Sequence, residues 1–421
     1  MNRTSEVEDA LRRTLRHAAD QAPELLSGAV SSQVELRYRR RRNRTRALLA
    51  AAAVLVIAGG AAGGLRAAGQ VADRAATAPD TTAADATATA LTSAEPSPAP
   101  TYAPRPGPVE SVWPQALREV PAKTPEGRAI EPLLLLDDRT MLVSTSASFE
   151  KADALYAYDL DDLSLRKIAD VVTPAGTTLF ASGFDVAEGH IAWWTQLGDG
   201  TAQIWAVPLD GGTAEIIGSL RSRPDSGLDK VEIVGDRVAF SVSTGGVYTV
   251  PLKGGAVEAV EDGAGMHLLS WPWIGAPGPY GAGPAPFSLI RDVETGATDQ
   301  AVIRHGEELT ACGVTLCVGS YEGAGFYRSR DGSGQKELPG GVERQPPAGD
   351  RFHVSVIRYG ERSVGVVLVD LKTGASADLG IKPKFQGGGM SIQGAGFDAD
   401  GRGVIYRIGD TLRVIDVTKI T

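Results

Sequence analysis

The chain has 421 residues and a formal net charge of −9, with 51 glycines, 25 prolines and only two cysteines. The charge is unevenly divided: residues 1–46 carry eleven arginines against six acids, so the remaining 375 residues carry a net charge of −14. A basic segment beside an apolar one indicates anionic lipid headgroups rather than nucleic acid, and we expect no nucleic-acid partner.

Residues 1–46 are predicted to form a short helical tail. Ser5 and Glu8 have the spacing of a capping box. Behind them apolar side chains recur every three to four residues, as on one helix face: Val7, Leu11, Leu15, Ala18 and Ala22. This stripe either packs on itself or on lipid, or it docks a cytoplasmic protein partner.

The next segment, residues 47–65, is a nineteen-residue stretch without a charged or polar side chain. At about 1.5 Å per residue it would span roughly 28 Å as a helix, close to the hydrocarbon thickness of a bilayer. Seven arginines precede it and predict a cytoplasmic N-terminus: Arg37, Arg39, Arg40, Arg41, Arg42, Arg44 and Arg46. We therefore expect a single-pass plasma-membrane protein. A cleaved secretory signal and a buried soluble helix are the alternatives.

Residues 66–111 are rich in alanine, threonine and proline and have few large apolar side chains. Such a composition cannot offset the entropy of ordering the chain, and it predicts a disordered linker. The linker would hold the following domain, residues 112–421, away from the membrane on its outer side.

Residues 112–421 contain a repeat of short apolar strands, most of which end in an acidic or proline-containing turn. The repeat recurs every 39 to 49 residues, as LYAYDL from Leu155, IWAVPLDGG from Ile204, VYTVPLKGG from Val247, FSLIRDVETG from Phe287, FYRSRDGSG from Phe326, VVLVDLKTG from Val367 and LRVIDV from Leu412. This period fits a blade of four short strands. Helical periodicity is scarce, so we predict an all-β fold, a β-propeller of seven blades, with six or eight as alternatives.

The two ends of this region are predicted to pair. The last repeat ends at the C-terminus without a following strand, and residues 112–121 precede the first full repeat. Pairing them would close the ring and remove open sheet edges, which are prone to aggregation.

One repeat also carries a family resemblance. FDADGRGVIYRIGDTLRVIDV from Phe397 resembles the repeat of TolB-type and WD-like propellers, in which an Asp-Gly turn joins two strands before an apolar strand ending in aspartate. The layout of tail, span, linker and outer propeller resembles single-pass membrane proteins of actinobacteria, some of them similar to membrane-bound anti-sigma regulators. The tail has no cysteine, in contrast to the zinc-containing members of that group.

Few residues carry recognisable chemistry. Cys312 and Cys317 are spaced to face each other across a hairpin, and outside the cell they are expected to form a disulfide; two buried thiols are the alternative. No phosphate loop, nucleophile elbow or paired metal-binding histidines occur. Asp398-Ala399-Asp400-Gly401 is interpreted as a hairpin turn rather than a calcium loop. We expect no catalytic residue, metal or cofactor.

A recognition loop is predicted at the glycine- and proline-rich segment near Trp271, Trp273 and Tyr280. Packing between blades is the alternative role for these aromatic side chains. We thus expect a binding or sensing propeller that recognises an extracytoplasmic protein or glycan and relays inward, with a sigma factor as one such cytoplasmic partner. The alternatives are an envelope-acting lyase or glycan hydrolase, and a structural scaffold.

Overall fold

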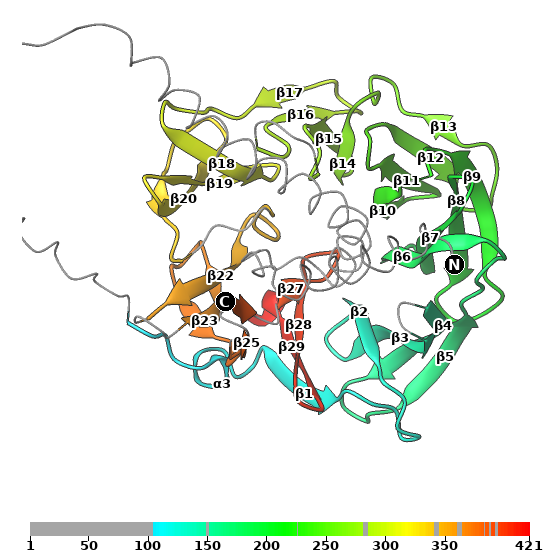
Figure 1. Ribbon diagram of the computed structural model, residues 1–421, viewed down its shortest axis with the longest axis horizontal. Coiled ribbons are helices and arrows are strands. Elements are labelled where there is room, and N and C mark those ends of the chain that lie inside the picture. Colours follow the sequence, from blue (N-terminus) through cyan, green and yellow to red (C-terminus); the bar gives the residue numbers. More distant parts are fainter. Residues whose placement is uncertain are drawn as a thin grey trace, which may run out of the picture. The chain divides into compact units, whose positions relative to one another are not determined.

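The fold is a ring of seven small antiparallel sheets, seen along its axis in the computed structural model (Figure 1). The structure describes residues 104–148, 151–224, 226–280, 285–340, 345–359, 364–382, 384–386, 389–391 and 395–421, with backbone only for 384–386 and 389–391. The predicted tail, membrane span and most of the linker lie outside these residues. The two helices among the described residues, of four and three residues, are too short to span a bilayer.

Blades 1 to 3 each have four strands in chain order from the centre of the ring outward. Blade 1 consists of β2 (Glu131–Leu135), β3 (Thr140–Ser148), β4 (Lys151–Asp159) and β5 (Leu165–Asp170). Blade 2 consists of β6 (Thr177–Ala187), β7 (His190–Leu197), β8 (Thr201–Pro208) and β9 (Glu215–Arg221). Blade 3 consists of β10 (Leu228–Val234), β11 (Arg237–Val242), β12 (Val247–Pro251) and β13 (Glu258–Ala259).

Blade 4 has short strands of three or four residues, whereas those of blades 5 and 6 reach six and seven. Blade 4 consists of β14 (His267–Ser270), β15 (Trp273–Ala276), β16 (Leu289–Asp292) and β17 (Thr298–Gln300). Blade 5 consists of β18 (Glu307–Cys312), β19 (Leu316–Tyr321), β20 (Ala324–Ser329) and β21 (Lys336–Glu337). The described part of blade 6 consists of β22 (Phe352–Arg358), β23 (Val364–Asp370) and β24 (Ser376–Asp378), and a two-stranded hairpin follows, β25 (Lys384–Gln386) and β26 (Gly389–Ser391).

Blade 7 joins the two ends of the described chain, which confirms the predicted ring closure. It consists of β27 (Gly396–Phe397), β28 (Gly403–Ile408), β29 (Thr411–Asp416) and, outermost, the N-terminal strand β1 (Leu117–Pro121). Strand β1 pairs with β29 over five residues, from Leu117 opposite Ile415 to Pro121 opposite Thr411. The one-turn helix α3 (Val109–Val112) precedes β1, and the 3-10 helix η1 (Val417–Lys419) follows β29. The prediction of a seven-bladed all-β propeller is confirmed.

The sequence repeat corresponds to one strand of each blade. Six of its copies fall on the third strand of a four-stranded blade, and the copy from Val367 falls on β23. The aspartate that ends several of these strands caps the next turn, because Asp159 and Asp292 each accept the backbone amides two and three residues later. These side chains favour the turn by replacing a backbone acceptor.

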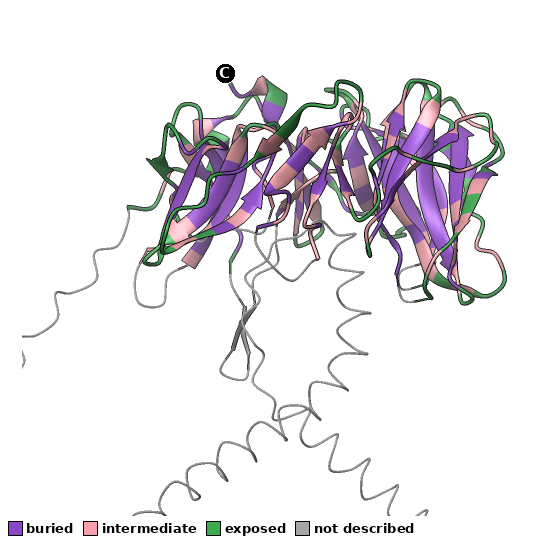
Figure 2. Ribbon diagram, turned by 90° about the horizontal axis from the view of Figure 1, so that it is seen from above, coloured by how far each residue is buried: buried purple, intermediate pink, exposed green. Residues whose placement is uncertain are grey.

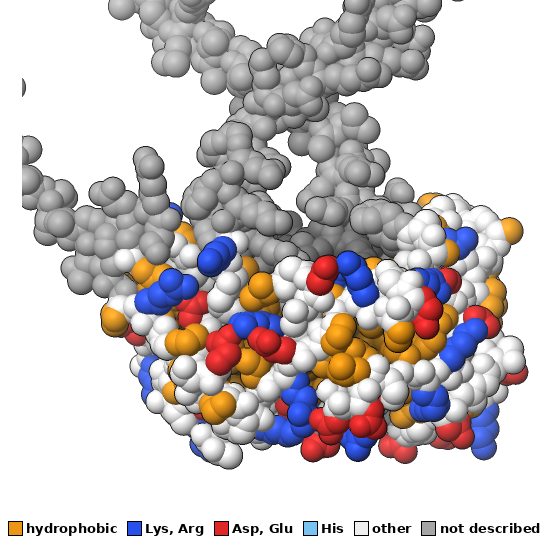
Figure 3. Space-filling model, turned by 90° about the horizontal axis from the view of Figure 1, so that it is seen from below, with side chains coloured by type: hydrophobic (Ala, Val, Ile, Leu, Met, Phe, Trp, Pro, Cys, Tyr) orange, Lys and Arg blue, Asp and Glu red, His pale blue; other side chains and the backbone are white. Residues whose placement is uncertain are grey.

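Apolar side chains fill the seams between neighbouring blades. Trp193 of β7 stacks between Phe184 of β6 and Trp205 of β8, with ring centroids 5.8 and 6.2 Å apart. Seen edge-on, the strands are mostly buried and the turns exposed (Figure 2). On the outer wall in Figure 3, acidic and basic side chains lie interspersed around apolar ones. The ring also has exposed ion pairs, such as Arg118 with Asp161, 3.1 Å apart. Such pairs contribute little to stability.

Candidate functional site

The antiparallel order gives the ring two different faces. Turns between first and second strands, and between third and fourth strands, share one face, which we call the turn face; η1 follows a third strand and lies at it. The remaining connections, including residues 277–288 between β15 and β16, lie at the opposite face, the loop face. Because first strands are innermost, the turns after them converge near the axis of the turn face.

Three carboxylates at these inner positions connect neighbouring blades. Asp185 of β6 accepts the amide of Ile233 in the next blade at 2.6 Å. Asp398, directly after β27, accepts the amide of Leu135 in blade 1 at 3.0 Å. Glu232 of β10 accepts the amide of Trp271 at 3.2 Å. Each carboxylate therefore satisfies a backbone donor of the following blade, which fixes the inner strands relative to each other.

Asp400 brings a fourth carboxylate to this place, and we call Asp185, Glu232, Asp398 and Asp400 the central carboxylate group. Asp400 is exposed in the turn between β27 and β28, yet its carboxyl lies within hydrogen-bonding range of Asp185, two blades away. Residues 398–401 form the predicted hairpin turn, in which the amide of Gly401 donates to the carbonyl of Asp398 at 3.0 Å.

Burial and mutual repulsion favour protonation of this group. Burial raises the pKa of Asp185 to about 7, and the nearby charges of Asp400 and Glu232 act in the same direction. Asp400 is exposed as a residue, but its carboxyl is desolvated by the surrounding chain, and this together with the charge of Asp398 raises its pKa to about 6. Burial also raises the pKa of Asp398 to about 6, outweighing its three backbone amides. Two carboxyls so close cannot both ionise without cost, so near neutral pH they share a proton.

Two cations and one aromatic residue adjoin the group, and the charge of one of them, Arg402, acts to lower the pKa of Asp398. The Lys230 ammonium lies 3.2 Å from the Glu232 carboxylate and donates to the carbonyl of Leu269 at 2.5 Å. Trp271, whose amide binds Glu232, is half-buried and donates its indole N–H to Glu294 at 3.0 Å. Carboxylates beside an aromatic ring can bind cationic groups or sugar hydroxyls. In the described part of the chain, no three His, Cys, Asp or Glu side chains are arranged to hold a metal ion.

The predicted recognition residues do not lie in one loop. Trp271 lies in the turn between β14 and β15, at the turn face, and Trp273 begins β15. Tyr280 follows β15 in the long connection at the loop face, and all three side chains are half-buried. The four-residue strand β15 lies between Trp271 and Tyr280 and leads from one face to the other. Trp271 therefore belongs with the central carboxylate group and Tyr280 does not.

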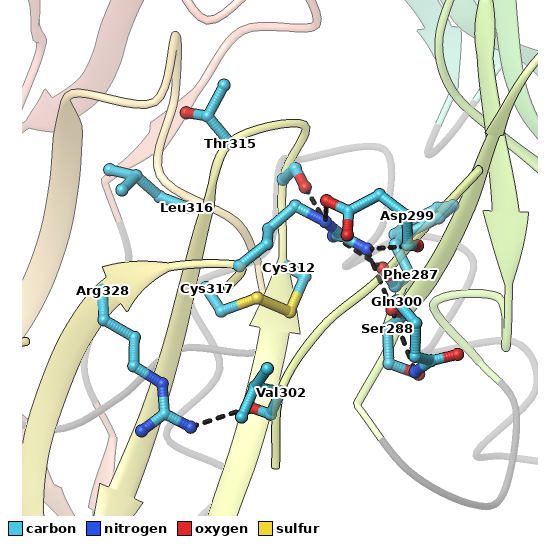
Figure 4. Close-up of a disulfide and its surroundings, with 12 residues drawn as sticks. Phe287, Ser288, Asp299, Gln300, Val302, Cys312, Thr315, Leu316, Cys317 and Arg328 are labelled. Atoms are coloured by element: carbon cyan, nitrogen blue, oxygen red, sulfur yellow. Dashed lines mark hydrogen bonds and ion pairs between the residues drawn. A yellow bond between two sulfur atoms is a disulfide. The ribbon is translucent and has the colours of Figure 1, made fainter. Parts of the chain in front are cut away.

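The two cysteines lie opposite each other on β18 and β19 and are joined in a disulfide, with an S–S distance of 1.98 Å (Figure 4). Both are buried. The buried guanidinium of Arg330 lies beside them and donates to the carbonyls of Phe287, Ser288 and Gly313. These contacts tie blade 4 to blade 5, and the disulfide stabilises the hairpin at their centre.

A buried histidine network lies at the seam between blades 3 and 4. His267 Nδ1 lies 2.5 Å from the carboxylate of Asp229, which also accepts the hydroxyl of Ser241. Since Ser241 donates to the aspartate and not to the histidine, the three side chains do not form a nucleophile relay. His353 is also buried, and burial lowers its pKa to about 4, so it is neutral.

The predicted orientation arginines, Arg37 to Arg46, lie outside the described residues. The central carboxylate group was not anticipated as a site, although the segments that carry it contain a shared Gly-Phe-Asp at residues 183–185 and 396–398. This triplet was the signal in the sequence that could have indicated equivalent positions in two blades.

No known protein-family model matches the sequence, and no curated protein sequence matches it. The chain is similar in structure to an uncharacterized protein of Listeria monocytogenes EGD-e, with 8% identity over 72% of this chain and 95% of that one, at a TM-score of 0.41. It is similar to the WD40 β-propeller domain of Doa1, with 11% identity, 71% and 97% coverage and a TM-score of 0.36. A putative TolB from Agrobacterium tumefaciens shares 15% identity, with 71% and 97% coverage and a TM-score of 0.30.

Proposed function

We propose that this protein is a membrane-anchored binding module whose propeller takes an extracytoplasmic ligand at the centre of its turn face. The observation that carries the proposal is the central carboxylate group, which gathers acids from blades 2, 3 and 7 with Trp271 beside them. Asp400 is the exposed member of the group. The chemistry fits a positively charged or polyhydroxylated group on an envelope protein or glycan.

The anchor and its orientation are part of the proposal and rest on the sequence. Residues 47–65 cross the plasma membrane, the arginine-rich residues 1–46 stay in the cytoplasm, and the propeller lies outside. The test introduces one cysteine at Ser5 or at the exposed Asp410 and treats intact cells with a membrane-impermeant maleimide. Labelling at Asp410 but not at Ser5 is expected. Labelling at neither position in intact cells, but at both after lysis, would contradict the outward orientation.

The tail provides the inward output. Its apolar stripe and capping box suit a docking helix, and the partner class is a cytoplasmic protein such as a sigma factor. Pull-down with the full chain in detergent is expected to recover such a partner, and a deletion of residues 1–22 is expected to lose it. Recovery of the same cytoplasmic proteins by both forms, or of none by either, would refute this role.

A second candidate function is hydrolysis or elimination on an envelope glycan, because the Asp185 and Asp400 carboxyls share a proton near neutral pH and could serve as acid and base. Several contacts weigh against it. Asp185, Glu232 and Asp398 already accept backbone amides, which is a structural use. Release of reducing ends from purified envelope glycan by the full chain, abolished in Asp400→Asn, would establish the enzyme; the binding proposal expects no release.

A further inference from the structure

Residues 104–121 attach the chain to two blades in succession. The segment before α3 adds to the outer edge of blade 6: Gly107 accepts the amide of Asp378 at 2.9 Å, and Pro108 forms a parallel bridge with the same residue. Arg105 Nε donates to the Asp378 carboxylate at 2.5 Å, where Asp378 is 4% exposed and Arg105 57% exposed. The guanidinium of Arg105 also lies 5.7 Å from the centre of the Tyr359 ring.

After α3 the same segment attaches to blade 7. Trp113 is buried in a cluster that includes Val354 and Leu368 of blade 6 and Val404 of blade 7. Arg413 of β29 then pairs with two carboxylates of the segment, Glu110 at 2.5 Å and Glu119 at 2.6 Å. Strand β1 completes the attachment through its five-residue ladder with β29.

The register makes the β1–β29 ladder vulnerable at one end. The chain enters β1 at Leu117, which lies opposite Ile415, and the C-terminus leaves β29 one residue later at Asp416. A pull, or thermal fraying, that begins at the N-terminal side would therefore break the pairs one at a time rather than together. Residues 105–108, which contact Asp378, come before Leu117 in the chain. They therefore hold the segment in place before such fraying reaches Leu117.

We propose that residues 104–121 form a clasp with two latches, of which the outer one, at Asp378, must release before the ring can open from its N-terminal side. The outer latch consists of Arg105, Gly107 and Pro108 on Asp378; the inner latch is β1 on β29. This inference depends on neither the membrane anchor nor the ligand of the proposed function, so it can fail independently of them. Among the described residues, the clasp is the segment that connects the N-terminal part of the chain to the ring.

Hydrogen exchange on the full chain in detergent tests the clasp. Arg105→Ala is expected to speed amide exchange in residues 117–120 by about two- to tenfold, because one partly exposed ion pair no longer opposes fraying. Arg105→Lys is expected to retain most of the protection. Arg237→Ala, which removes contacts of a partly exposed arginine with Glu258 and Thr249 in blade 3, is the control away from the segment and should leave β1 unchanged.

Two results would overturn the clasp. One is that the amides of β1 in Arg105→Ala exchange at the wild-type rate. The other is an acceleration of equal size in β1 and in the buried strands β7 and β11, which would mean that the ring opens only by global unfolding. Since Arg105 is mostly exposed, its substitution leaves the folded ring available for either outcome.

Discussion

Replacing Asp185 by asparagine should stabilise the protein at alkaline pH, although it removes a residue that binds the amide of Ile233. The asparagine carbonyl can accept that amide, and its N–H group can donate to Asp400, which mimics the protonated carboxyl. The wild-type protein must instead hold Asp185 ionised above pH 7, near the charges of Asp400 and Glu232. The substitution removes this unfavourable charge.

The sign and size of the expected stability change follow from the pKa of Asp185. The pKa of Asp185 rises from 3.8 to about 7 on folding, so between these values the folded chain binds more protons than the unfolded chain. Its contribution to stability is therefore complete below pH 4 and is lost as the pH rises through 7. At about 1.4 kcal/mol per pKa unit, reduced for relaxation of the coupled pair, the loss is on the order of 2 to 4 kcal/mol.

Urea unfolding of wild type and Asp185→Asn at pH 5 and pH 8 measures this directly. The variant is expected to gain stability relative to wild type between the two pH values, and the comparison cancels the titrating groups that do not interact with Asp185. Asp159→Asn is the control of opposite sign once the series is extended to about pH 2.5, because backbone amides and Arg139 lower the pKa of Asp159 below 3.8; this variant should lose more stability at pH 5 and pH 8 than at pH 2.5. A stability difference between Asp185→Asn and wild type that is the same at both pH values would refute the reasoning.

Three further substitutions test the packing of the ring by the same unfolding measurement. Trp113→Ala empties a buried site between blades 6 and 7 and should cost about 3–5 kcal/mol, whereas Val172→Ala at an exposed position should cost less than about 0.5 kcal/mol. Arg330→Met leaves the buried carbonyls of Phe287 and Gly313 without this donor, whereas Ser288 keeps the amide of Ala301, and should cost about 2–4 kcal/mol; a cost near zero would mean that water replaces the guanidinium. Replacing Cys312 and Cys317 together by alanine should cost about 2 kcal/mol, the chain-entropy value for so short a loop, and a variant as stable as the oxidised protein would contradict it.

The fold was predictable from local patterns. Several third strands carry a regular signal because they combine alternating burial with a turn-capping residue, as β4 does with Asp159 and β16 with Asp292. Ring closure was predictable because the last repeat lacks an outer strand, and a propeller leaves one place for β1. Blade 4 was harder to recognise, since its four strands have only three or four residues each.

The central carboxylate group was not predictable in the same way. Asp185 and the amide it binds are 48 positions apart, and Asp398 and Leu135 are 263 positions apart. These contacts arise only when the ring closes and the inner strands converge. Conversely, Trp271 and Tyr280 are close in sequence, but an extended strand between them directs them to opposite faces. Sequence proximity thus grouped residues that the fold separates.

Equilibrium binding of the full chain in detergent to a purified envelope fraction tests the proposed function most directly. Asp400→Asn is the probe, and Asp410→Asn is the control, because Asp410 is also an exposed aspartate, paired with Lys123 in the turn at the other end of β28. The account predicts saturable binding that weakens about tenfold or more in Asp400→Asn and is unchanged in Asp410→Asn. Equal affinity of all three proteins would contradict a ligand at the centre of the turn face.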